Sequence, residues 1–185
     1  MAEVFSVNTL RAIIDKTGGF AKGNRYHVSF TKYPAGLTGG VATVGNLQYL
    51  CETVSLPTKS LAGTPHDIYG PPREIAYRET FTDAALNFIL DDAFTIKKFF
   101  DSWQTKIINP ITGNPSYYSD YVGTINISRL SNNATEFTGG SNTYNIQLIE
   151  AYPSVVGEVA LGHTLGTDAL RLSVTFKYRR WNFLP

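Results

Sequence analysis

The sequence predicts a mainly β protein of the α+β class, an antiparallel β-sandwich or β-barrel of about six to seven strands with one flanking α-helix and a short N-terminal helix. Three observations support this fold class. Several segments alternate apolar and polar residues, most clearly residues 170–178, as half-buried strands do. Apolar residues recur at helical spacing in two segments, 6–17 and 91–108. Strands and helices do not alternate along the chain, which argues against a parallel sheet.

The chain opens with a predicted helical arm, residues 1–20. Its apolar residues recur at the spacing of one helix face: Val7, Leu10, Ile13 and Ile14. Ser6 can cap this helix, and Gly18 can end it. A strand is predicted next, over residues 25–31, because apolar and polar side chains alternate there.

Glycine and proline divide the next part of the chain. Residues 33–46 are rich in glycine and poor in charge, so we expect a long loop, and loops of this length are usually functional or disordered. A second strand is predicted over residues 47–57, where it ends at a proline. Residues 58–72 contain further glycines and prolines and are predicted to form a second irregular loop.

A predicted hairpin precedes the main helix. Its strands are residues 73–81 and 85–90, and we expect them to pair with each other across a turn near Thr82. The helix follows over residues 91–108, with Asp91 or Asp92 as its cap. Its apolar residues form one stripe: Ile96, Phe99, Phe100, Trp103 and Ile107. Such a stripe predicts a helix packed over a sheet.

The C-terminal half is again predicted to be strands. Residues 117–130 and 143–152 alternate, and the polar segment 131–142 joins them as an exposed hairpin tip. A further loop leads to the last strand, 170–178. The length of the chain suits one domain, residues 1–185.

The composition suggests a surface that partner molecules cover. Charged residues make up 17% of the chain, below the ~25% of ordinary soluble domains. There are 11 Tyr and 11 Phe residues, and protein interfaces lose charge and gain aromatic residues. High strand content alone would also favour aromatic residues, so both explanations stay open. The net charge of +1 provides no overall attraction to nucleic acid or to an anionic membrane.

The sequence predicts no catalytic, cofactor-binding or metal-binding residue, so we expect a protein that is not an enzyme. The three histidines, His27, His66 and His163, are far apart and have no other ligand at metal-binding spacing. Cys51 is the single cysteine and lies in an apolar strand, where a buried thiol is the usual outcome. One cysteine fits a reducing compartment. No apolar run approaches the ~20 residues of a membrane span, and no signal peptide is recognised.

The last strand has a basic, hydroxyl-rich face whose environment the alternation does not determine. Its members are Arg171, Ser173, Thr175, Lys177 and Arg179. They could face water, nucleic acid or another copy of the chain. Basic and aromatic residues also cluster at 176–181, which would suit a sheet-based protein that binds single-stranded nucleic acid. The small net charge and the lack of a second basic cluster favour an exposed strand face or a protein interface instead.

Four features in a fixed order carry a resemblance to a known family. A strand ends in Ser-Leu-Pro at 55–57, and an apolar strand at 86–90 precedes the aromatic helix. The segment "AYPSVVG" follows at 151–157, and the final alternating strand ends in aromatic residues at 178–181. With this order and spacing, the chain resembles the tail tube proteins of T4-type contractile-tailed bacteriophages. Type VI secretion tube proteins share that fold.

The resemblance implies a structural virion protein without a cofactor. Its members assemble into hexameric rings that stack into a hollow tube, a contractile sheath surrounds the tube, and DNA passes through the lumen without sequence-specific binding. The implied partners are other copies of the chain, the sheath protein, and the baseplate and tail-terminator proteins. The implied location is the virion tail, and the host cytoplasm during assembly, without stable membrane insertion. A baseplate-to-tube adaptor or a tube-end ring protein of the same fold is the alternative.

Under this interpretation two sets of residues become candidates for assembly contacts. The loop over 58–72 would contact the next ring through Leu61, Ile68, Tyr69, Pro71 and Pro72. The polar face of the last strand would face the lumen or a neighbouring subunit. Because a strongly basic lumen would hold DNA back, we expect its cations to pair with carboxylates across an interface.

Overall fold

The computed structural model describes residues 6–16, 18–67, 70–132, 142–162 and 169–184. This part of the chain contains four helices and nine strands, which confirms the α+β class and exceeds the predicted strand count. The helices are α1 (Val7–Lys16), α2 (Gly40–Leu50), α3 (Thr95–Ile107) and α4 (Tyr118–Tyr121). The strands are β1 (Tyr26–Lys32), β2 (Cys51–Val54), β3 (Lys59–His66), β4 (Arg73–Phe81), β5 (Ala84–Ile89), β6 (Gly123–Leu130), β7 (Asn142–Val156), β8 (Arg171–Lys177) and β9 (Arg180–Leu184).

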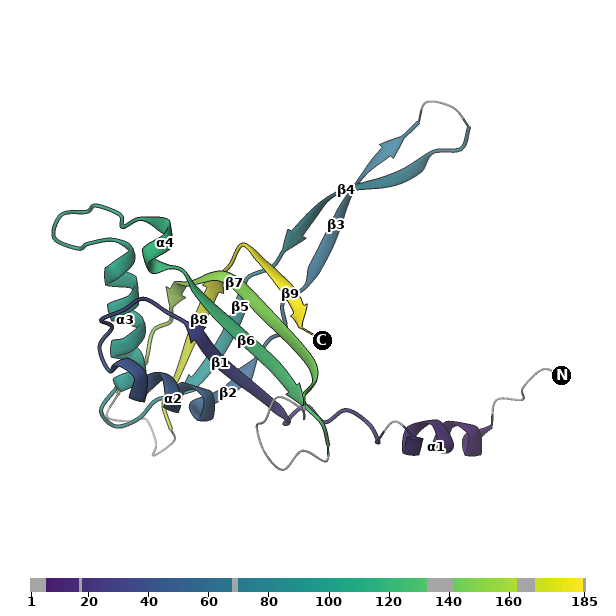
Figure 1. Cartoon of the computed structure of the whole chain (residues 1–185), viewed down its shortest axis with the longest axis horizontal. Helices are drawn as coiled ribbons and strands as arrows, with labels where there is room; N and C mark the ends of the chain where they lie inside the picture. The colour runs from purple at the N-terminus through teal and green to yellow at the C-terminus, as the bar shows by residue number, and fades with distance from the viewer. Residues whose placement is uncertain (1–5, 17, 68–69, 133–141, 163–168, 185) are drawn as a thin grey trace.

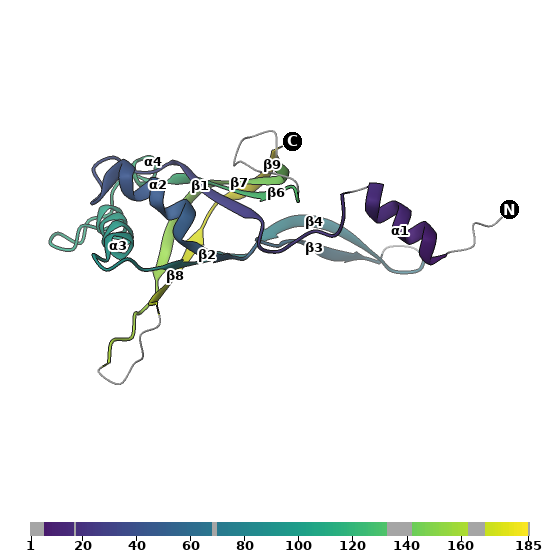
Figure 2. The same ribbon diagram turned by 90° about the horizontal axis from the view of Figure 1, so that it is seen from below.

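Seven strands form one antiparallel sheet in the order β1-β6-β7-β8-β5-β2, with β9 also paired to β7. Strands β8 and β9 lie one after the other along β7 and pair with its last and first parts, respectively. Between these two parts Glu150 has a φ of 56°, and the β6–β7 register shifts beside it. A bulge of this kind bends a strand. The sheet therefore folds over into two layers, which Figure 2 shows with the helices at one end.

The two layers enclose a core that α2 and α3 close at one end. The predicted stripe of α3 is confirmed in four of its five residues, which are buried: Ile96, Phe99, Phe100 and Trp103. The ring of Phe100 lies between those of Phe88 and Phe176, at centroid distances of 5.3 and 5.8 Å. Leu47 brings α2 into the same core. In Figure 1 these helices lie at one end of the sheet, while α1 and the β3–β4 hairpin project from the other.

Local capping explains where the two predicted helices begin. The carboxylate of Asp91 accepts hydrogen bonds from the Thr95 N–H at 2.9 Å and the Thr95 hydroxyl at 2.7 Å, so Asp91 holds the first residue of α3, although the N-cap position is Phe94 and the helix begins later than predicted. The Ser6 hydroxyl accepts the Thr9 N–H at 3.2 Å, which confirms the cap of α1. No residue of α1 is buried, so this helix keeps its apolar face in solvent within a single chain. None of the described helices is both long enough and apolar enough to cross a bilayer.

The predicted loop over 33–46 is wrong, since α2 begins inside it. The helix continues to Leu50, so the predicted strand over 47–57 is reduced to β2. The three-residue spacing of Val44, Leu47 and Leu50 is helical, and the neighbouring glycines masked it. Because α2 lies between β1 and β2, it covers the side of the core where the two layers would otherwise part.

The predicted irregular segment over 58–72 is also wrong, because β3 occupies most of it. Its partner is β4, and β5 pairs instead with β2 and β8, so the predicted pairing of residues 73–81 with 85–90 does not occur. The chain makes no hairpin turn at Thr82, so β4 leads directly into β5. Together they pair with the segment formed by β2 and β3, and the four strands make one long two-stranded ribbon. Strand β7 extends to Val156, beyond its predicted end, and residues 133–141 of the predicted tip lie outside the described residues.

Candidate assembly surfaces

The polar face of β8 is present as the alternation predicts. Leu172, Val174 and Phe176 are buried in the core. On the opposite side of the strand Arg171, Ser173 and Lys177 are exposed, and Thr175 is half-buried. Arg179 lies just beyond the strand, where the chain passes into β9. The four strand residues therefore share one outer face, which we call the β8 polar face.

The first cation of the β8 polar face is paired within the chain. The guanidinium of Arg171 donates two hydrogen bonds to the carboxylate of Glu52 on β2, at 2.6 and 3.0 Å. These hydrogen bonds lower the pKa of Glu52, so its charge persists in mild acid. Within the single chain this cation already has a carboxylate partner, and its pairing across a subunit interface stays a prediction.

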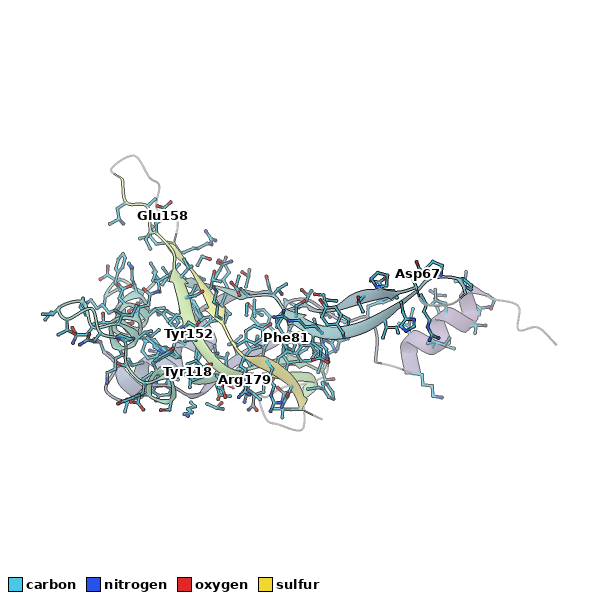
Figure 3. All side chains as sticks on the ribbon, turned by 90° about the horizontal axis from the view of Figure 1, so that it is seen from above. Asp67, Phe81, Tyr118, Tyr152, Glu158 and Arg179 are labelled. Carbon is cyan, nitrogen blue, oxygen red and sulfur yellow. The ribbon has the colours of Figure 1, made fainter. Side chains whose placement is uncertain are left out.

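Arg179 belongs to a separate cluster that sequence reasoning missed. Its guanidinium lies 3.1 Å from the carboxylate of Glu150, the residue at the bend of β7. The hydroxyl of Tyr118 donates to the same carboxylate at 3.1 Å, and the Tyr118 ring belongs to an edge-to-face row with Tyr121 and Tyr152. Figure 3 shows Tyr118, Tyr152 and Arg179 on neighbouring parts of the surface. No local pattern links residues so far apart in the sequence.

The predicted cluster of basic and aromatic residues at 176–181 is divided between two sides of the sheet. Phe176 is buried, and Trp181 packs against the core. Lys177 and Arg179 are exposed on the outside. Because the rings are turned inward, they do not form a stacking platform beside the cations, which single-stranded nucleic-acid binding would require.

The outer face of the other layer carries side-chain hydrogen bonds between β6 and β7. The side-chain amide of Gln147 donates to Asn126 at 3.1 Å, and the Ser128 hydroxyl donates to Asn145 at 2.8 Å. At the edge of this layer β9 leaves Phe183 53% exposed, with its ring 5.4 Å from that of Tyr144. An edge strand with an exposed aromatic ring needs cover, which a neighbouring subunit can provide.

The β3–β4 hairpin, which we call the arm, is the most exposed element of the sheet structure. None of the residues of β3 and β4 is buried. Leu61 and Tyr77 are 62% and 67% exposed. Figure 3 shows the arm leaving the body near Phe81 and extending to Asp67. Because an isolated two-stranded hairpin is marginally stable in water, the arm is suited to being covered by another molecule.

The arm contains the residues that were predicted to contact the next ring. Leu61 lies in the middle of β3 with its side chain exposed. Pro71 and Pro72 are exposed immediately before β4. Ile68 and Tyr69 lie outside the described residues. The arm therefore brings Leu61 and the two prolines to one projection, and Tyr77, which sequence reasoning missed, lies on it as well.

The described residues offer little for catalysis. No group of three or more His, Cys, Asp and Glu among them is placed to hold a metal ion. Burial raises the pKa of the Cys51 thiol to about 12, so the reactive thiolate is scarce at neutral pH. The imidazole Nε2 of His27 lies 2.8 Å from the side-chain oxygen of Gln48, and His66 lies on the arm. His163 lies outside the described residues.

The sequence of the chain is similar to one known protein family. The sequence from residue 21 to residue 184 matches one protein family, the phage tail tube proteins. The chain belongs to this family. The resemblance drawn from the sequence is therefore confirmed, and with it the assignment to a family of structural proteins of the virion tail. No curated protein sequence matches the chain.

Solved structures agree with the tail tube family at the level of the fold. A chain from the sheath-tube complex of an extracellular contractile injection system, PVC, in the extended state is 15% identical, with a TM-score of 0.62 over 98% of this chain and 99% of that one. A chain of the PVC sheath/tube terminator is 16% identical, with a TM-score of 0.61 over 90% and 97%. A chain of the anti-feeding prophage baseplate is 14% identical, with a TM-score of 0.62 over 89% and 95%.

Proposed function

We propose that the chain is the repeating subunit of the inner tube of a contractile phage tail. Six copies form a ring, the rings stack into a hollow tube, and DNA is delivered through the lumen. Membership of the tail tube family is the observation that carries this proposal. Two surfaces support it, since both the arm and the edge of β9 present apolar side chains that a single chain leaves uncovered.

In this assembly the β8 polar face lines the lumen. Two of its four residues are serine and threonine, and Glu52 neutralises Arg171, so Lys177 is the remaining cation of the face. A low net charge suits a conduit, because every uncompensated cation would add a phosphate contact and slow the passage of DNA. Leu61, Pro71 and Pro72 of the arm, together with Tyr77, contact the next ring.

The partners follow from the same proposal. Among the similar structures are a sheath-tube complex, a baseplate and a tube-terminating cap. We assign to this chain the corresponding partners of a phage tail: a contractile sheath around the tube, a baseplate at one end and a terminator at the other. Assembly takes place in the host cytoplasm, before the finished tail becomes part of the virion.

Electron microscopy of the purified protein tests the proposal directly. We expect six-fold rings and, at higher concentration or with baseplate added as initiator, tubes of uniform width. The Phe183→Asp variant places a charge at the β9 edge and should reduce ring formation, because the side chain becomes buried between subunits. A protein that remains monomeric at high concentration, with and without the initiator, contradicts the proposal.

The charge balance of the lumen gives a second test. Replacing Glu52 with glutamine leaves Arg171 without its carboxylate partner, six times in every ring. We expect variant tubes to retain a short DNA duplex that wild-type tubes release, with an affinity that falls steeply as salt rises. The matched control is Asp101→Asn, which removes a carboxylate from the Lys97 pair on α3, outside the lumen. Equal retention by the Glu52 variant, the control and the wild type contradicts a lumenal β8 face.

A single ring at the end of the tube is the second candidate function. It is favoured by the baseplate and terminator chains, whose TM-scores of 0.62 and 0.61 match that of the tube chain. The copy number in purified tails separates the two functions. A tube subunit recurs in many rings, whereas an adaptor or tube-end protein is present in one.

A further inference from the structure

Opposite ends of the subunit carry a projecting loop and an open cavity, and within the described residues no side chain covers the tip of the loop or fills the cavity. The loop, residues 108–117, joins α3 to α4; in Figure 1 it extends at the helix end of the sheet. The cavity has a volume of about 730 Å³ and is lined by the start of β1, the end of β2 and the end of β6. These three segments lie at the end from which α1 and the arm project.

The loop holds its backbone in a fixed conformation by its own hydrogen bonds. Ile108 and Pro115 form a β-bridge across its base. The side-chain oxygen of Asn109 accepts the N–H groups of Ile111 and Thr112 at 2.9 and 3.4 Å, so it orders the tip. At this tip Ile111 is 93% exposed. An apolar side chain on a pre-organised loop loses little entropy on binding, which favours a role as an anchor.

The cavity is the open end of the two-layered core. The α2 and α3 helices close the other end, whereas here Val54, Leu56 and Ile127 line an accessible space. Its rim carries Lys22 and Arg129, and its acid Glu52 is already paired with Arg171. In contrast, the only charged side chain from residue 107 to residue 121 is Asp120, an acid. The loop itself, residues 108–117, is uncharged, so its apolar tip matches the apolar lining of the cavity and brings no cation to the basic rim.

We propose that Ile111 of one subunit inserts into the open core cavity of a subunit in the next ring. A contact between two different surfaces at opposite ends of a molecule is heterologous and continues into an open, helical array. The insertion rests on the proposed stacking of rings. It adds a contact independent of the arm, and it explains why the core is left open at one end.

The test uses the full chain and two variants that damage opposite ends. Ile111→Lys removes the anchor and brings a cation to a basic rim, and Leu56→Lys blocks the cavity. We expect each variant to form rings but no tubes, with a critical concentration for stacking raised roughly tenfold or more. Ile111→Val keeps an apolar anchor and should form normal tubes.

Mixing the two variants gives a result that a general loss of stability cannot produce. Rings of Ile111→Lys retain an intact cavity, and rings of Leu56→Lys retain an intact loop. The mixture should therefore produce pairs of rings that do not elongate. A covalent check is the double variant Ile111→Cys/Leu56→Cys, which should link subunits of successive rings on mild oxidation, since Cys51 is buried and does not compete.

The outcomes separate this inference from the proposed function. Absence of rings from the wild-type protein overturns the proposed function. Rings and tubes of normal length from Ile111→Lys overturn the insertion and leave the tube function in place. Tubes of the double cysteine variant that remain uncrosslinked also overturn it.

Discussion

Replacing Trp103 with alanine is expected to lower the free energy of unfolding by about 3–5 kcal/mol, the range found when large aromatic side chains are removed from a core. Trp103 is fully buried, and its ring packs edge-on against those of Phe99 and Phe176. Its indole N–H also donates to the backbone oxygen of Tyr121 at 2.8 Å. The variant therefore loses the packing that fixes α3 and the contact that holds the start of β6 beside it.

Urea denaturation followed by far-UV circular dichroism measures this loss as a shift of the midpoint at constant slope. Trp103→Phe is the intermediate variant, because it retains most of the apolar volume and loses the hydrogen bond, worth about 1 kcal/mol. The surface control is Ile111→Ala, which should leave the midpoint unchanged because the side chain is exposed. A Trp103→Ala midpoint equal to that of the surface control contradicts the assigned core.

Local patterns were enough to predict the elements that depend on near neighbours. The cap of α1, the contact of Asp91 with the start of α3, the stripe of α3 and the alternation of β8 are each fixed within a few residues. Pairing was harder to predict. Residues 73–81 and 85–90 look like a hairpin, yet the two-residue link at Thr82 continues the ribbon and leaves β4 paired with β3. β4 does not fold back onto β5 because β8, which is about 90 residues away in the sequence, occupies that edge of β5.

Of the assembly surfaces, only the one formed by the residues of a single strand could be predicted from the sequence. The β8 polar face follows from alternation, but the neutralisation of Arg171 by Glu52 depends on two strands with β5 between them. The half of the arm that contains β3 was predicted to be an irregular loop because the glycines and prolines of residues 58–72 are typical of turns, whereas residues 73–81 were predicted to be a strand. The core cavity and the cluster around Glu150 have no local sequence signal, because each combines segments from separate parts of the chain.

Removing the arm is expected to abolish tube formation while the body of the subunit stays folded. The design follows from the pairing at its root. The N–H of Thr58 donates to the Thr82 hydroxyl at 3.0 Å, and the N–H of Thr82 donates to the Thr58 carbonyl at 3.2 Å. A two-residue Asn-Gly turn can therefore join Thr58 directly to Thr82, since type I′ turns connect paired antiparallel strands.

The folded body should tolerate this deletion because no residue of β3 or β4 belongs to the core. We expect an unchanged urea midpoint together with rings that do not stack, as seen by electron microscopy and sedimentation. Tyr77→Ala in the full chain is the milder variant. If Tyr77 is an interface hot spot worth about 2 kcal/mol, its loss raises the critical concentration for stacking roughly thirtyfold. The matched control on the same arm is Glu79→Gln, which removes an exposed ion pair with Lys59 and should change assembly little.

The arm and the Ile111 loop make separable contributions to the same ring-to-ring contact. The arm carries exposed apolar residues on a projecting hairpin, and an isolated hairpin is only marginally stable, so part of its binding energy is spent on ordering it. The Ile111 loop is already ordered, so its contribution is the burial of one anchor. We therefore expect Tyr77→Ala and Ile111→Ala to act additively on the critical concentration, as sites without shared contacts do. Normal tubes from the armless protein contradict the arm as an inter-ring element, whatever the result at Ile111.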